Sequence, residues 1–307
     1  MSFTNNLENR FLAKPNGNIR HRNASGQAVL TVGLLALAAV SLAPFGMMLV
    51  MSLKSNAQIF AHFWDLPSPP RWDFYGKAWL ALSGYIVNTL IVAASTVIGV
   101  LTLSSMAGYT FARHRFPGRE LLYYLILALM MIPGVLTLIP TFALVKAIAL
   151  PAIHIGGWTL GPFALLNTRW ALILPYISGG QILGILLCRG FFQGLPEEMF
   201  EAARLDGAGE FTIYRTIALP LSKPILAAVA ITTTLGVYND YVWPLVALTD
   251  NNIQTFSVGV TKFAGEYSLD YGPTLAGYAL GSLPLLLLFA LGMRPFIQGI
   301  TAGALKA

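Results

Sequence analysis

The side chains that could carry chemistry in this chain are few and far apart. Asp240 is the only acidic residue inside a long apolar run, Cys188 is the only cysteine, and the four histidines are scattered. Zinc and haem sites need several ligands at short spacings, and acid–base or nucleophilic catalysis needs groups that face each other. The sequence therefore predicts no catalytic, cofactor-binding or metal site, and indicates that the chain is not an enzyme.

A nucleotide-binding loop is also missing. No segment matches Gly-x-x-x-x-Gly-Lys-[Ser/Thr], the loop whose backbone cradles nucleotide phosphates. If ATP drives this protein, a partner subunit must bind both the ATP and its Mg²⁺, and this chain must offer that subunit a docking surface.

The polar segment 189–223 is suited to offer such a surface. Leu195-Pro196-Glu197-Glu198 predicts the start of a short helix, because proline is preformed for a first turn and carboxylates favour the positive end of the helix dipole. Gly207, followed by Gly209, predicts its end, where a left-handed backbone is common. Between them we expect one apolar, small-residue surface that fits a groove on a partner, made of Met199, Phe200, Ala202, Ala203 and Leu205. The alternative is a helix that only lies on the membrane surface.

The rest of the chain has the composition of a membrane protein. Of its 307 residues, 56% are hydrophobic and only 10% are charged, and the mean hydropathy is +0.66. Soluble domains carry about 25% charged residues. A bilayer core needs about 20 apolar residues in a helix. Six runs meet that need, which predicts an all-α integral membrane fold with spans at 29–51, 85–111, 121–145, 170–188, 224–245 and 271–293.

The basic residues predict the orientation of these spans. The net charge of +6 is spread thinly between apolar runs and is not clustered with aromatics, which speaks against nucleic acid binding. Most of the 19 Lys and Arg residues fall on the side that holds both termini and the segments 113–120 and 189–223, so that side is predicted to be cytoplasmic. Segments 52–84 and 250–272 are then external. The predicted organisation is a polar cytoplasmic tail at 1–28, a transmembrane domain at 29–298 and a cytoplasmic tail at 299–307.

Two proline motifs stand out in the third predicted span. Met131-Ile132-Pro133-Gly134 and Leu138-Ile139-Pro140 predict two bends within two turns, which would help line a cavity that changes shape. The alternative is ordinary membrane-helix composition, in which Gly and Pro are tolerated.

Four motifs resemble a known transporter family. The order Glu201-Ala202-Ala203-x-x-Asp206-Gly207-Ala208, then Ile217-x-Leu219-Pro220, resembles the E-A-A loop of permease subunits of bacterial ATP-binding-cassette importers. Asn88-Thr89-Leu90, the run from Ala107 to Arg119, and Tyr238-Asn239-Asp240-Tyr241-x-Trp243-Pro244 resemble the sugar-importer branch, in particular its six-helix maltose-type permease. The resemblance covers nearly all of 29–307.

That resemblance implies a transport subunit of the inner membrane with defined partners. It implies a second, different permease, an ATPase homodimer and an extracytoplasmic sugar-binding protein, in addition to membrane lipid. It also implies a cytoplasmic coupling helix between the fourth and fifth spans, and a tail at 299–307 that contacts the ATPase dimer. The ATPase-coupling residues that it indicates are Phe200, Glu201, Ala202, Ala203, Asp206, Gly207, Leu219 and Pro220.

The remaining polar residues have more than one interpretation each. Asp240, with Asn239 and Trp243, is expected near the outer interface, in a structural or gating role that ties helix ends together. The alternatives for Asp240 are direct contact with the substrate and proton transfer. Asn88, Tyr109 and Thr137 either line a solute pathway or form interhelical hydrogen bonds.

The competing function is a secondary, ion-coupled transporter. It would need intramembrane charged pairs or an inverted repeat, and the sequence contains neither.

Overall fold

The computed structural model describes residues 24–304 except 151–152, 156–157 and 161–162, and the chain forms two compact units. The first unit extends to Val50 and consists of one apolar helix, α2 (Ala24–Met51), with Pro44 inside it. The predicted first span is therefore part of a longer helix. Most of the predicted tail at 1–28 lies outside the described residues.

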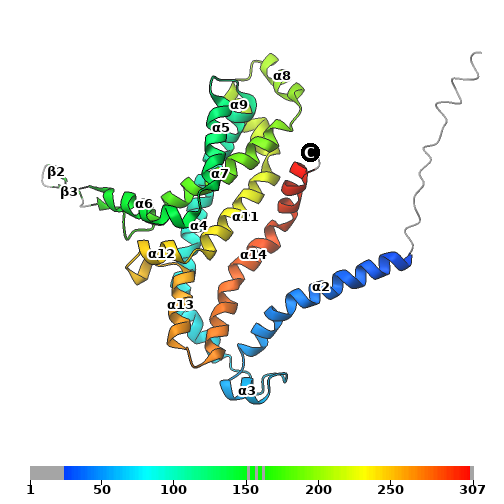
Figure 1. Ribbon diagram of the computed structural model, residues 1–307, viewed down its shortest axis with the longest axis vertical. Helices are drawn as coiled ribbons and strands as arrows, with labels where there is room; N and C mark the ends of the chain where they lie inside the picture. The colour runs from blue at the N-terminus through cyan, green and yellow to red at the C-terminus, as the bar shows by residue number, and fades with distance from the viewer. Residues whose placement is uncertain (1–23, 151–152, 156–157, 161–162, 305–307) are drawn as a thin grey trace, which may run out of the picture. The chain divides into compact units, whose positions relative to one another are not determined.

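Four helices form the body of the second unit: α4 (Asp73–Arg113), α7 (Trp170–Gln193), α11 (Lys223–Asn239) and α14 (Tyr271–Ala304). They run alongside one another in Figure 1, with α4 in contact with the other three. Shorter elements connect them: α3 (Asn56–Ala61), α5 (Arg119–Ala128), η1 (Leu129–Met131), α6 (Gly134–Ala147), α8 (Glu197–Leu205), α9 (Glu210–Ile213), η2 (Tyr214–Ala218), α10 (Leu219–Leu221), α12 (Val242–Ala247), η3 (Asn251–Ile253) and α13 (Phe256–Glu266).

Within the described part of the chain, four helices are long and apolar enough to cross a membrane, and up to six spans result if each of two bent pairs counts as one. The four are α2, α4, α7 and α14. The first bent pair, Arg119–Met131 with Gly134–Ala147, covers the third predicted span, where the hydropathy suggested one continuous helix. The second pair, Glu210–Leu221 with Lys223–Asn239, overlaps the fifth predicted span only in its second helix. The sequence predicted six spans, and the structure confirms four to six candidate spans.

The third predicted span breaks sharply at the first of its two proline motifs. The helices on either side of Ile132-Pro133 meet at 104°. Pro133 lacks an amide hydrogen and restricts the residue before it, and Ile132 is accordingly extended, with ψ of 116°. Pro140 lies inside α6, where the backbone remains helical, and the second predicted bend stays a prediction.

The fifth predicted span is also shorter than expected. Its helix, α11, ends at Asn239, and Asp240 takes an extended conformation with ψ of 123°. The chain resumes as α12 at Val242. The polar Asp240 therefore divides the predicted run 224–245 into two helices.

The second predicted span is longer than the sequence suggested. Its helix, α4, starts at Asp73 and has 41 residues, which at 1.5 Å per residue is about 60 Å. A hydrocarbon core is about 30 Å thick, so α4 extends well beyond it. The segment 52–84, predicted to be external, thus includes the first turns of α4.

The all-α prediction also misses four short strands between α6 and α7. Strand β1 (Ala149–Leu150) pairs with β4 (Phe163–Ala164), and β2 (Ile153–Ile155) pairs with β3 (Trp158–Leu160), both antiparallel. β-branched and aromatic residues such as Ile153 and Trp158 favour strands over helix.

Helices α4 and α7 approach each other closely because glycines lie at their contact. A Cβ atom at Gly108 of α4 would lie 2.5 Å from the Cβ of Cys188, and one at Gly184 of α7 would lie 2.7 Å from the Cβ of Ser104. Such distances are far below van der Waals contact. Small residues thus fix this helix pair, as in many membrane proteins.

We expect Gly108→Val to force α4 and α7 apart, because overpacking a tight contact costs roughly 1–3 kcal/mol. The matched control is Gly190→Val, since a Cβ at that α7 position meets nothing within 4 Å. The yield and melting temperature of the detergent-solubilised protein measure the effect. Equal values for the two variants would contradict this packing.

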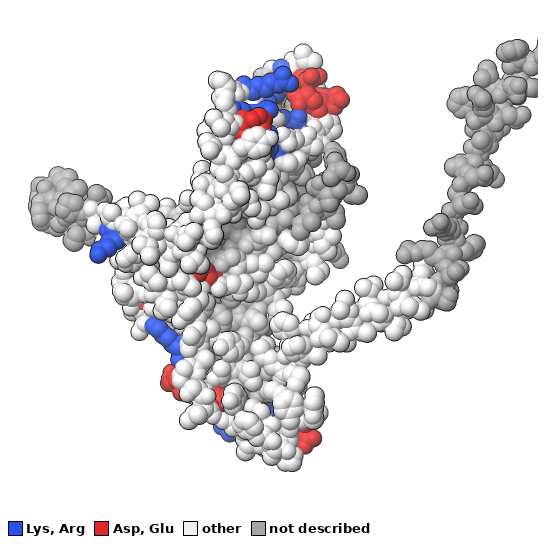
Figure 2. Space-filling view, viewed as in Figure 1, with Lys and Arg blue, Asp and Glu red and all other residues white. Residues whose placement is uncertain are grey.

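Charged residues gather at the two ends of the second unit. Figure 2 shows Lys, Arg, Asp and Glu around α8 and α9 at one end and near α3 and α13 at the other, with a mostly uncharged surface between them. In Figure 1, the C-terminal end of α14 points toward the end of the unit that carries α8. This distribution is typical of a protein whose middle lies in lipid.

Candidate functional site: the surface around helix α8

The segment between α7 and α11 forms the short helix that the sequence predicts. Helix α8 begins after Pro196 with Glu197 and Glu198 in its first turn, and Asp206 follows its last residue. Gly207 has φ of +81°, the predicted left-handed conformation. The amide of Gly207 donates to the carbonyl of Arg204 and that of Ala208 donates to Ala203, the pair of bonds that defines a Schellman motif.

The predicted single apolar surface of α8 is divided between two faces. Phe200 is fully buried and packs with Tyr109 and Phe192, and Ala203 lies on the same side. These two residues are three positions apart, so they share a helix face. The other face remains accessible, with Leu205 88% exposed, Met199 39% exposed and Ala202 exposed. Phe200 therefore anchors α8 to the chain, and the prediction that it belongs to the accessible docking surface is wrong.

Arg113, the last residue of α4, holds the start of α8. One guanidinium nitrogen, Nη1, forms an ion pair with Glu197, and the other, Nη2, donates to the carbonyls of Phe192 (2.6 Å) and Leu195 (2.7 Å). The guanidinium also lies 4.0 Å above the ring centre of Phe200. The side chain is only 6% exposed. Arg113 thus joins the ends of α4 and α7 to the first turn of α8.

A second arginine closes the network around the C-terminal half of α8. Arg204 donates to Glu197 (3.1 Å) and to Glu210 of α9 (3.0 Å). Hydrogen bonds from Arg204 to Glu210 and Glu197 raise the pKa of its guanidinium above the usual value. Tyr109 reaches the same Glu210 carboxylate with its hydroxyl group at 3.3 Å. Charge-assisted bonds of this kind are stronger than neutral ones.

Glu201, which the resemblance places among the coupling residues, does not hold the helix. It is exposed, and no hydrogen bond or ion pair links it to another residue in the described part of the chain. The carboxylate that receives the arginines is Glu197. The ion pair between Arg113 and Glu197 was not predicted from the sequence. Its signal is a basic residue in the last turn of one helix and an acidic residue in the first turn of another. Asp206 and Pro220 are exposed, and Leu219 is half-buried in α10.

Two of the three candidate pathway residues form structural contacts. Asn88 is buried and donates to the carbonyls of Asn252 (2.7 Å) and Gln254 (3.1 Å), and Tyr109 is buried beneath α8. Both therefore make the interhelical contacts of the alternative interpretation, and a pathway role for them stays a prediction. Thr137 is exposed on α6 and donates to the carbonyl of Gly134.

Asp240 ties helix ends together, as the sequence suggested. One carboxylate oxygen accepts from the Tyr176 hydroxyl of α7 at 2.8 Å, and the other accepts from the amides of Val242 and Trp243 at the start of α12. Trp243 is buried and donates its indole N–H to the carbonyl of Ala171. Asn239 is exposed. A gating role for these residues stays a prediction.

Comparisons with known proteins agree on one family. The family model described as "Binding-protein-dependent transport system inner membrane component" matches residues 100–302. The chain is 31% identical to the diacetylchitobiose uptake system permease of Streptomyces coelicolor over 91% of this chain and 89% of that protein. It is 33% identical to the maltodextrin transport system permease of Bacillus subtilis over 71% and 74% of the two chains.

A solved structure shows the same fold. It is a chain of a bacterial ABC transporter involved in the import of the acidic polysaccharide alginate, with a TM-score of 0.72 and 21% identity, covering 88% of this chain and 96% of that one. The present chain therefore belongs to the family of binding-protein-dependent transport system inner membrane components, the permeases of ATP-binding-cassette importers.

Proposed function

We propose that this chain forms half of the translocation pathway for a sugar that an extracytoplasmic binding protein delivers, and that α8 couples transport to ATP hydrolysis by a separate subunit. The sugar assignment is supported by the relatives, whose names specify diacetylchitobiose, maltodextrin and melibiose, raffinose or stachyose. The partners are a second, different permease and an ATPase homodimer that binds ATP and Mg²⁺. Family membership favours this function over an ion-coupled carrier.

One observation supports the coupling role most directly. Helix α8 is fixed to the ends of α4 and α7 on one side and leaves an apolar, small-residue face exposed on the other. An exposed apolar helix face beside charged residues fits a groove on a partner protein. Because Arg113 holds α8 rigidly, movement of the partner would be transmitted to the transmembrane helices as rigid-body motion. The coupling residues are then Ala202, Leu205, Asp206 and Gly207 at the contact, with Phe200 and Ala203 behind them.

Changing the exposed face should remove the ATPase subunit. We expect Leu205→Asp to lower retention of the ATPase at least about tenfold, since burying an uncompensated charge at an interface costs several kcal/mol. Leu269→Asp is the control, because Leu269 is 87% exposed at the opposite end of the unit, against 88% for Leu205. Affinity purification of the assembled complex measures retention. Full retention in Leu205→Asp would show that α8 is not the docking element.

The orientation of the chain is part of the same proposal, with α8 and both termini in the cytoplasm. We expect Ser268→Cys, at an exposed position after α13, to react with a membrane-impermeant maleimide in intact cells. Thr212→Cys on α9 should react only after permeabilisation. Cys188 is fully buried and gives little background. The reverse labelling pattern would overturn this topology.

The C-terminal tail is expected to take part in the assembly. Helix α14 continues to Ala304, so residues 299–304 of the predicted tail are helical, and in Figure 1 the helix runs toward the end of the unit where the ATPase is proposed to dock.

A further inference from the structure

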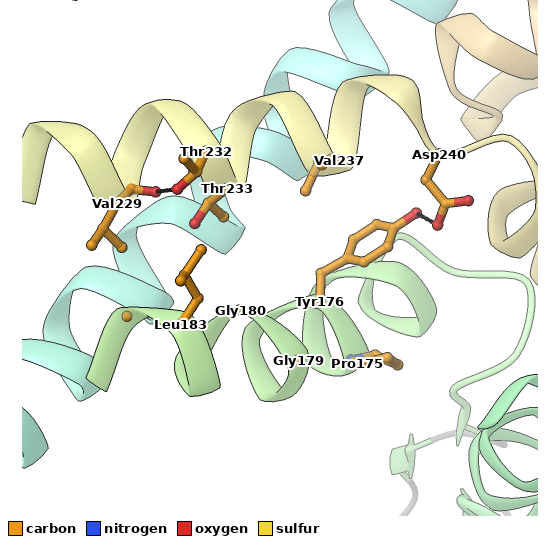
Figure 3. Close-up of a pocket in the computed structure, with 12 residues that line it drawn as sticks. Pro175, Tyr176, Gly179, Gly180, Leu183, Val229, Thr232, Thr233, Val237 and Asp240 are labelled. Carbon is orange, nitrogen blue, oxygen red and sulfur yellow. Dashed lines mark hydrogen bonds between the residues drawn. The ribbon is translucent and has the colours of Figure 1, made fainter. Parts of the chain in front are cut away.

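A crevice opens between α7 and α11 in the apolar middle of the second unit. Its volume is about 400 Å³, within the range of small-molecule sites. Figure 3 shows Tyr176 and Asp240 at one end of the crevice and Thr232 and Thr233 toward the other. Glycines at Gly179 and Gly236 line it from the two helices. This crevice, which has polar residues at both ends, takes no part in the contact between α4 and α7 or in the network around α8.

The crevice exists because side chains are missing from its walls. A Cβ atom added at Gly179 or at Gly236 would meet nothing within 4 Å. These two glycines therefore differ from Gly108 and Gly184, whose absent side chains let helices touch. At Gly179 and Gly236, the lack of a side chain leaves open space, and a ligand in that space could contact the peptide backbone.

The crevice offers hydrogen-bonding groups that the fold does not fully use. The Tyr176 hydroxyl donates to Asp240 and keeps its lone pairs as acceptors. Thr232 donates to the carbonyls of Ala228 and Val229, so its oxygen is also left to accept. The Thr233 hydroxyl has no hydrogen-bond partner among the described residues, and Figure 3 shows it pointing toward α7. Apolar walls at Leu183 and Val237 separate these groups.

The charge of the crevice restricts its ligand. Asp240 is the only charged residue among the lining residues that the structure describes, and no Lys or Arg accompanies it. An anionic solute would meet the carboxylate without a compensating cation, which is unfavourable in a medium of low dielectric constant. Neutral polyols avoid this penalty, because their hydroxyl groups both donate and accept while their C–H faces contact an aromatic ring or aliphatic side chains.

We propose that this crevice is a contact site for a neutral sugar on its way through the membrane, with Tyr176, Thr232 and Thr233 bonding its hydroxyl groups and Asp240 excluding acidic sugars. The inference rests on the proposed transport function and adds to it where this chain touches the solute and which class of sugar passes. The backbone at Gly179 and Gly236 lets the sugar ring lie flat between α7 and α11. Asp240 thus has a selectivity role in addition to tying helix ends together.

Cysteine protection tests the contact directly. The full complex with Thr233→Cys, held in nanodiscs, is treated with a small methanethiosulfonate reagent in the presence of maltotriose, diacetylchitobiose, raffinose or an alginate oligosaccharide. At least one neutral sugar should slow labelling, about tenfold at ten times its Kd, because labelling follows the unoccupied fraction. The alginate oligosaccharide should not. Thr234→Cys, a half-buried neighbour on α11 that does not line the crevice, is the control whose labelling should be unaffected by sugar.

The outcomes separate this inference from the function on which it rests. If Thr233→Cys is not labelled, or if no neutral sugar protects it, the crevice is not a sugar contact, whether or not the wild-type complex transports sugar. Equal protection by the acidic oligosaccharide would overturn the selectivity assigned to Asp240. Absence of ATP-dependent uptake of every sugar by the wild-type complex would instead count against the proposed function.

Filling the crevice gives a second, independent measurement. A Cβ at Gly236 meets nothing within 4 Å, and Gly236 lines this crevice, whereas Gly190 on α7 has the same free space and lies outside it. We expect Gly236→Val to lower the uptake rate at least about tenfold, which corresponds to a rise of about 1.4 kcal/mol in the barrier to passage. Gly190→Val should transport at the wild-type rate. Both complexes should keep their ATPase subunits, so equal uptake by the two would overturn the site.

Discussion

Replacing Arg113 by alanine should detach α8 from the ends of α4 and α7 while the transmembrane helices still insert. The variant loses an ion pair to Glu197, two bonds to the carbonyls of Phe192 and Leu195, and the contact with the Phe200 ring. Hydrogen bonds to charged groups contribute about 1.5–3 kcal/mol each, and the carbonyls are left without partners. We therefore expect local unfolding of 194–209, seen as faster amide hydrogen exchange in that segment, together with loss of the ATPase from the purified complex.

Two further variants make this prediction specific. Arg113→Lys keeps the charge but lacks the planar fork that reaches Glu197 and both carbonyls at once, so it should restore only part of the protection. Arg115→Ala removes an exposed arginine of the same turn and should behave like the wild type. Wild-type hydrogen exchange of 194–209 in Arg113→Ala would show that α8 is held by its apolar contacts alone.

Replacing Gly207 by valine should uncouple ATP hydrolysis from uptake. The φ angle of +81° lies in a region that a β-branched residue avoids, at a cost of roughly 1–3 kcal/mol. The strain is relieved if the two Schellman bonds to Ala203 and Arg204 break and the end of α8 turns. We expect ATPase stimulation by the loaded binding protein, measured in reconstituted complexes, to fall to the basal rate while the two permeases still pair.

The neighbouring glycine provides the matched control for Gly207. Gly209 has an extended backbone with φ of −71°, and a Cβ there meets nothing within 4 Å. Gly209→Val should therefore retain stimulation. Normal stimulation and uptake in Gly207→Val would mean that the exit turn of α8 has no part in coupling.

Much of the α8 region could be predicted because local chemistry determines it. Proline and two carboxylates begin the helix, and a left-handed glycine ends it, as the structure confirms. The identity of the arginine that holds the helix could not be predicted. Arg113, Arg115 and Arg119 lie in one short run, and which of them turns inward depends on where the end of α7 lies in space.

The errors in the transmembrane region have a common physical origin. Hydropathy averages over a window, so it joins helices on either side of Ile132-Pro133 and of Asp240 into single spans. Polarity alone also cannot separate a pathway from a helix contact, which is why the sequence left both interpretations open for Asn88. Only the approach of η3 and α13 to α4 shows that Asn88 is already engaged.

The glycine contact between α4 and α7 limits where this protein can change shape. Two helices whose backbones contact each other at glycines cannot slide without a steric clash. Arg113 also attaches α8 to the ends of these two helices. Helix α11 is different, because it has only 17 residues, follows a 73° bend after Leu221, and ends at the extended Asp240. We expect α11 to turn as a short rod between two hinges against a rigid α4–α7 frame. Since the crevice lies between the rod and the frame, the same turn would open and close it.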